Sequence, residues 1–95
     1  MSKRDAYIQK LESQYDEWDA KIRELKAKAE GAEADARVEY HKQIESLQQK
    51  QKDAKAKLDE LRSASEDAWE DLKAGAESAW ASLKDAVESA TSRIR

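Results

Sequence analysis

His41 and Glu45 come closest to forming a chemical site by residue type and spacing. They lie four residues apart, so on a helix both side chains would project from one face and could hold a metal ion together. Two ligands are too few, because a structural zinc site takes four protein ligands. We therefore expect both residues to be solvated on the flank of a helix, and we expect no metal site.

The other polar residues form no catalytic pattern. The sequence contains 21 Asp and Glu residues, but acid/base catalysis needs two carboxyl groups in different environments within one pocket. The serines have no neighbouring base to activate them, cysteine is absent, and no glycine-rich phosphate loop is present. We expect no enzyme activity, no cofactor and no small-molecule substrate.

The balance of charge bears on the class of partner. The 18 Lys and Arg residues nearly match the acidic residues, which leaves a net charge of -3, whereas a nucleic-acid surface needs a basic stripe. No apolar stretch approaches the length of about 18 residues that spans a bilayer, and the first residues lack the apolar segment of a signal peptide. We expect neither a nucleic-acid partner nor a membrane-spanning segment.

Almost every residue in the sequence favours a helix. Among the 95 residues there is no proline and glycine occurs only twice, while Ala, Glu, Lys, Leu and Arg dominate. Apolar residues recur in steps of three and four from Leu11 to Ala36, and again to Leu61 after a stutter at Tyr40. The sequence predicts an all-α protein, and the packing residues of this part are Trp18, Ile22, Leu25, Ile44, Leu47 and Leu58.

The clearest boundary is the segment SASED at 63–67. Ser63 or Ser65 could cap a new helix, and the acidic residues that follow suit the positive end of its dipole. We expect residues 1–64 to form a long helix over about 3–62, and residues 65–95 to form a separate amphipathic helix over about 65–93.

The second part contains an eleven-residue repeat. Residues 65–75, 76–86 and 87–95 align without gaps, and the first two copies share Ala, Trp, Leu and Lys at fixed offsets. On a helix the repeat places its large apolar residues on one stripe and mostly acidic or serine residues opposite them. The stripe could pack against the first helix or enter a lipid interface, and the acidic outer face favours packing. Its large residues are Trp69, Leu72, Trp80, Leu83 and Val87.

The conformation at Gly31 decides how the apolar stripe of residues 1–64 is buried. A glycine within a helix costs only about 1 kcal/mol, and no Ser, Asn or Pro cluster flanks it to build a turn. We therefore favour a helix that continues through Gly31 and is about 90 Å long. The second helix can cover only half of that length, so an antiparallel homodimer crossing at the alanine-rich middle is favoured. The alternative is a monomeric three-helix bundle with a break at Gly31.

Two stretches carry a resemblance to known proteins: MSKRDAYIQKLESQYDEWDAKI at the start and LDELRSASEDAWEDLKAGAESAW in the second half. They resemble small bacterial coiled-coil proteins of unknown function, some of which are labelled stress-response proteins. The resemblance implies a cytoplasmic, non-catalytic protein, and it carries over no site residues. The eleven-residue repeat is also similar to those of late-embryogenesis-abundant proteins and exchangeable apolipoproteins.

Two functional hypotheses follow from these patterns. The first is a self-associating coiled-coil structural or interaction protein, linked to stress by the resemblance above, in which helix packing uses every apolar stripe. The second is a peripheral lipid- or membrane-surface protein that inserts the stripe of the C-terminal helix.

Overall fold

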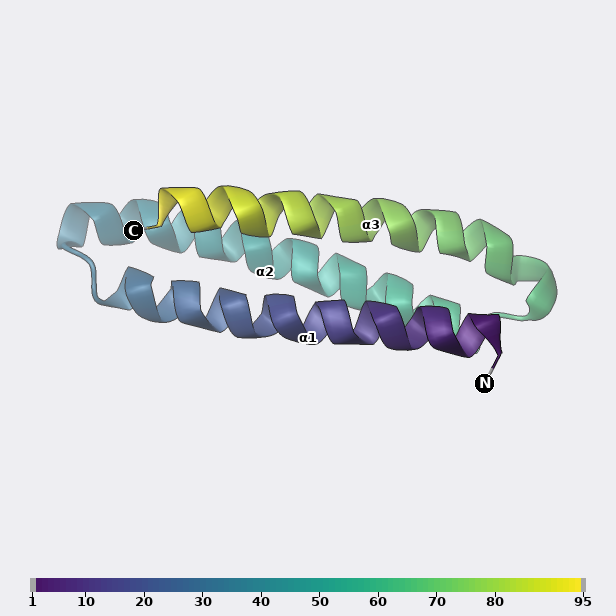
Figure 1. Cartoon of the computed structure of the whole chain (residues 1–95). Coiled ribbons are helices and arrows are strands. Elements are labelled where there is room, and N and C mark those ends of the chain that lie inside the picture. Colours follow the sequence, from purple (N-terminus) through teal and green to yellow (C-terminus); the bar gives the residue numbers. More distant parts are fainter. Residues whose placement is uncertain (1, 95) are drawn as a thin grey trace.

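Three helices lie side by side and run alternately up and down in the computed structural model, which describes residues 2–94 (Figure 1). They are α1 (Lys3–Glu30), α2 (Ala34–Ser63) and α3 (Glu66–Arg93). The bundle is elongated, with extents of 51 × 21 × 17 Å, because each helix runs nearly its whole length. The predicted all-α class is confirmed.

Serine side chains begin two of the helices. The hydroxyl of Ser2 accepts a hydrogen bond from the backbone N–H of Asp5 at 3.1 Å, and Ser65 accepts one from Ala68 at 3.3 Å. Each bond satisfies a backbone donor that the first turn of a helix leaves free. The break predicted at 63–65 is confirmed, and Ser65, not Ser63, is the cap.

The chain turns at Gly31, so the favoured uninterrupted helix over 3–62 is wrong and the three-helix alternative is correct. Helix α1 ends at Glu30, and residues 31–33 lead directly into α2. No side chain caps α2, because Glu33 makes no capping hydrogen bond. For a single chain, packing between distant residues favours this turn: folding back buries Ile22 and Leu25, which an isolated long helix would leave exposed.

A single apolar core runs the length of the bundle. All three helices contribute large side chains, and buried alanines on each helix let the backbones approach one another. Folding back covers the apolar stripe of α1 within one chain, so a second copy is not needed to cover it. The dimer itself stays a prediction. The buried residues are Ile8, Leu11, Ile22, Leu25, Ala29, Ile44, Leu47, Ala54, Leu58, Leu61, Ala76, Trp80, Leu83, Val87, Ala90 and Ile94.

Arg4 ties the start of α1 to the turn between α2 and α3. Its Nη2 donates to the carbonyl oxygens of Leu61 at 3.2 Å, Arg62 at 3.3 Å and Ala64 at 2.6 Å. The last carbonyls of a helix have no partner within the helix and carry the negative end of its dipole, so a guanidinium satisfies both needs. An ion pair of 3.1 Å between Arg62 and Glu12 adds a second link at this end.

We expect Arg4→Ala to lower the free energy of unfolding by about 1–3 kcal/mol, because it removes charge-assisted hydrogen bonds to partly buried carbonyls. Urea denaturation followed by circular dichroism measures the change. Arg23→Ala, on the same helix, is the matched control: Arg23 pairs only with Asp19 at the surface, so its loss should stay within about 0.5 kcal/mol. Equal losses in the two variants would contradict the role of Arg4.

Candidate functional site

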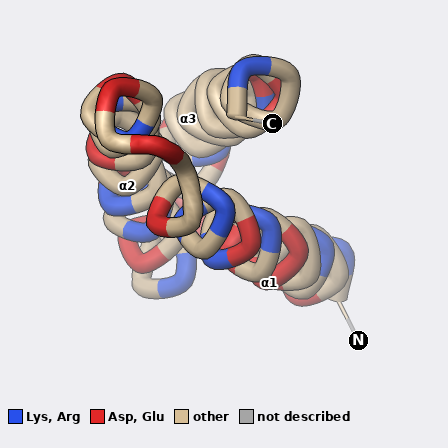
Figure 2. The backbone as a smooth tube through the Cα atoms, turned by 90° about the vertical axis from the view of Figure 1, so that its left-hand side faces the viewer, with Lys and Arg blue, Asp and Glu red and all other residues tan. Residues whose placement is uncertain are grey.

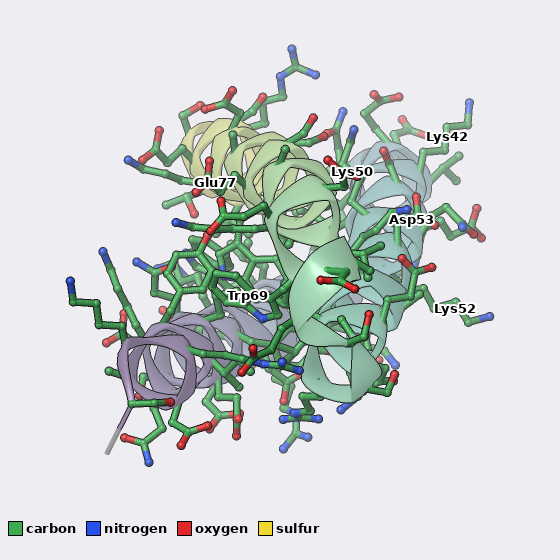
Figure 3. The ribbon with its side chains drawn as sticks, turned by 90° about the vertical axis from the view of Figure 1, so that its right-hand side faces the viewer. Lys42, Lys50, Lys52, Asp53, Trp69 and Glu77 are labelled. Atoms are coloured by element: carbon green, nitrogen blue, oxygen red, sulfur yellow. The ribbon has the colours of Figure 1, made fainter. Side chains whose placement is uncertain are left out.

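Aromatic side chains fill the space between α1 and α3, and we call these five residues the aromatic cluster: Tyr7, Tyr15 and Trp18 on α1, and Trp69 and Trp80 on α3. The rings of Tyr7 and Trp69 lie 5.7 Å apart at 76°. Trp80 lies 6.3 Å from Tyr15 and 6.2 Å from Trp18, in tilted geometry. These spacings are those of favourable ring pairs. Figure 3 shows Trp69 between the two helices.

Two cations cover the end of the cluster nearest the α2–α3 turn. The Nζ of Lys73 lies 4.9 Å from the ring centre of Tyr7 and 5.5 Å from that of Trp69. The guanidinium carbon of Arg4 lies 5.9 Å from the ring of Trp69. A cation at these distances is attracted to the negative face of a ring. The same positive charges therefore hold α1 and α3 together at one end.

The hydroxyl of Tyr7 donates a hydrogen bond to Oε1 of Glu77 at 3.1 Å, across from α1 to α3. Burial raises the pKa of Tyr7 to about 12, with further contributions from this hydrogen bond and from the charge of Glu77. Burial, followed by the charge of Asp19, also raises the pKa of Tyr15. A raised pKa keeps both phenols protonated, and Tyr7 donates its proton in the hydrogen bond to Glu77.

Shallow hollows lie along the seam between α1 and α3. One of about 300 Å³ is lined in part by Trp18 and Trp80, and another of about 240 Å³ in part by Tyr7 and Trp80. A larger hollow of about 560 Å³ lies between α1 and α2, and its lining is mostly Gln, Lys and acidic side chains. All three are open to solvent. They could seat a side chain of another helix more readily than they could enclose a small substrate.

The structure brings the eleven predicted packing residues into one core. Three of them are only partly buried: Trp18, Trp69 and Leu72. The others are buried: Ile22, Leu25, Ile44, Leu47, Leu58, Trp80, Leu83 and Val87.

Sequence reasoning missed several contributors. Ile8 lies three residues before Leu11, so extending the same periodicity would have found it. No local signal marks Arg4 or Glu77, whose partners lie on other helices.

The predicted flank residues His41 and Glu45 lie on α2, half-buried and exposed respectively. Within residues 2–94, no three His, Asp or Glu side chains gather closely enough to hold a metal ion. None of the helices in the described part of the chain is both long and apolar enough to cross a membrane.

Comparisons with protein-family models, with curated proteins and with solved structures gave no match for this chain.

We expect Trp80→Ala to lower the free energy of unfolding by about 3–5 kcal/mol, because it removes a buried ring that contacts Tyr15 and Trp18. Trp80→Phe should cost less than about 2 kcal/mol. The indole N–H has no acceptor among the described residues, so losing this buried donor offsets part of the lost volume. Urea denaturation measures both; equal losses would show that ring packing does not set the stability here.

Tyr7 should make the stability depend on pH in the alkaline range. Because its pKa is about 12 in the folded protein and about 10 when unfolded, the folded state holds this proton more tightly. The free energy of unfolding should therefore fall as the pH rises from 10 towards 12. Tyr7→Phe should show a smaller fall over the same range in urea titrations at several pH values. An identical pH dependence in the variant would contradict this assignment.

Proposed function

We propose that this protein is a non-catalytic helical module that acts by associating with further helices, beginning with copies of itself. The observation that carries the proposal is the partly exposed apolar seam between α1 and α3. The backbones of α2 and α3 lie close together, whereas aromatic side chains keep the backbone of α1 further from α3. Figure 2 shows α1 inclined away from the α2–α3 pair.

The open seam leaves apolar surface that another helix could cover. Trp18, Trp69 and Leu72 are only partly buried there, and open hollows lie beside Trp80. Covering apolar area is worth about 25 cal/mol per Å², so closer packing with a second copy would gain free energy. The proposal includes the cytoplasmic, stress-linked setting that the resemblance to bacterial coiled-coil proteins implies.

The distribution of charge supports a non-catalytic role. Among the described residues, no charged side chain is buried. Catalytic carboxylates and lysines owe their tuned pKa values largely to burial and to close charged neighbours within a pocket. Here acidic and basic residues are spread along all three helices (Figure 2) and are exposed or only partly buried, where they favour solubility and helix stability.

Lipid binding through α3 is the competing function. Trp80, Leu83 and Val87 of its stripe are buried against the other helices, so the bundle would have to open before they could enter a membrane. The exposed start of α3 carries Glu66 and Asp67, which anionic headgroups would repel.

Sedimentation from micromolar to millimolar protein tests the proposal. We expect a reversible monomer–dimer equilibrium in plain buffer. We also expect blue-shifted tryptophan emission, because Trp80 is buried, that is unchanged by zwitterionic or anionic vesicles. A strict monomer at every concentration would contradict self-association. Emission and helicity that change only with vesicles would favour the lipid function in its place.

A further inference from the structure

Outside the seam between α1 and α3, the surface of the bundle offers little apolar area for self-association. Val38 is the one large hydrophobic side chain that is exposed in the described part of the chain, at 61%. An isolated exposed valine is ordinary on a protein surface and does not form an interface. The apolar area available to a second copy therefore lies on the inner faces, and reaching it requires a helix to move.

Helix α1 is the helix that can move with least loss. It closes only partly against α3, whereas α2 and α3 form a closely packed hairpin that would remain without it. If α1 moved away, it would expose a face of the α2–α3 hairpin. That face already packs against Ile22, Leu25 and the aromatic residues of α1. The α1 of a second copy presents the same side chains.

The connection between α1 and α2 is short and begins in a helical conformation. Gly31 has φ -84° and ψ -3°, which lie in the helical region, and no residue of the connection has a positive φ. Glu33 is extended, with φ -62° and ψ 155°, and it makes no capping hydrogen bond. A change of backbone conformation confined to residues 31–33 would therefore join the two helices.

A joined helix keeps its apolar stripe in phase. Ala29, Ala32 and Ala36 follow steps of three and four, so the buried faces of α1 and α2 would lie on one side of a straight helix. This helix would be about 90 Å long, whereas the bundle measures 51 Å. Its α1 half could not reach its own α3 and would have to pack on another molecule.

From these observations we infer that two copies exchange α1, with the connection at residues 31–33 straightened and each α1 seated on the partner's α2–α3 hairpin. This inference rests on the proposed self-association and names its partner and its route. The contacts of the bundle re-form between chains, including those of Arg4 with the carbonyls at the end of α2 and that of Tyr7 with Glu77. Exchange of identical elements creates a dimer at low cost for this reason.

Substitutions in the connection distinguish the closed bundle from the exchanged dimer. Proline suits the first residue of a helix and requires an extended residue before it, and Glu33 provides that conformation ahead of Ala34. Ala34→Pro should therefore leave the bundle folded and block the straight helix, weakening dimerisation by more than about a hundredfold. Gly31→Ala should leave dimerisation within about twofold, because Gly31 is already helical in the bundle and alanine stabilises the closed and joined forms alike. The new Cβ makes only ordinary contacts in the turn, the nearest at 3.7 Å.

Sedimentation gives the dimerisation constants, and circular dichroism checks that each variant keeps its helicity. Val38→Lys is the matched control on the outer surface, and it should leave dimerisation unchanged. If Ala34→Pro dimerises as strongly as the original chain, the exchange is overturned while self-association stands. If the original chain stays monomeric up to millimolar concentration, the exchange and the proposed self-association both fail.

Cross-linking reports which chain α1 lies on. The sequence has no cysteine, so chains carrying either Glu12→Cys or Arg62→Cys can be mixed in urea, refolded together and treated with a short bis-maleimide. The two positions contact each other across α1 and α2 in the bundle, and both are partly exposed. Exchange predicts a covalent pair of unlike chains, and Glu39→Cys at the other end of α2 should give none with Glu12→Cys. Dimers that yield no Glu12–Arg62 link would overturn the exchange.

Discussion

Burial of one narrow apolar stripe on each of three highly charged helices is the interaction on which this structure depends. The stripes combine large residues such as Leu25 and Trp80 with fully buried alanines such as Ala54 and Ala76. The small residues let the helices approach, and the large ones fill the space between them. Each helix packs against both of the others, so the loss of any one of them exposes part of the core.

The two ends of the bundle are held by different means. At one end Arg4 binds the terminal carbonyls of α2, Ser65 caps α3 and Glu12 pairs with Arg62, so charge and hydrogen bonding fix the geometry. At the other end Glu33 has no capping bond, and one side-chain hydrogen bond of 3.0 Å, from Arg37 to the carbonyl of Ala32, holds the connection. Local opening should therefore begin at the 31–33 connection, where fewer side-chain interactions must be broken than at the Arg4 end.

The parts of the fold that the sequence predicted are those with a local signal. The three- and four-residue steps indicated helices, the SASED segment marked the second turn, and the eleven-residue repeat marked the buried face of α3. The turn at Gly31 lacked such a signal, because its flanking residues favour a continuous helix and the deciding contacts come from distant residues. The same limit applies to Arg4, whose carbonyl partners lie 57 to 60 residues away in the sequence, and to the pair of Tyr7 and Glu77.

The residues around Gly31 are compatible with a turn and with a continuous helix for a physical reason. The closed bundle and the joined helix bury the same stripes and make the same contacts, within one chain or between two. Those contacts cancel when the two forms are compared, so the balance depends on the conformation of residues 31–33 and on the entropy of association. A change of about 1 kcal/mol in the connection alters that balance about fivefold per chain, while a change in the core weakens both forms together. Control of self-association would therefore act at the connection and not at the aromatic cluster, even though the aromatic cluster supplies much of the stability.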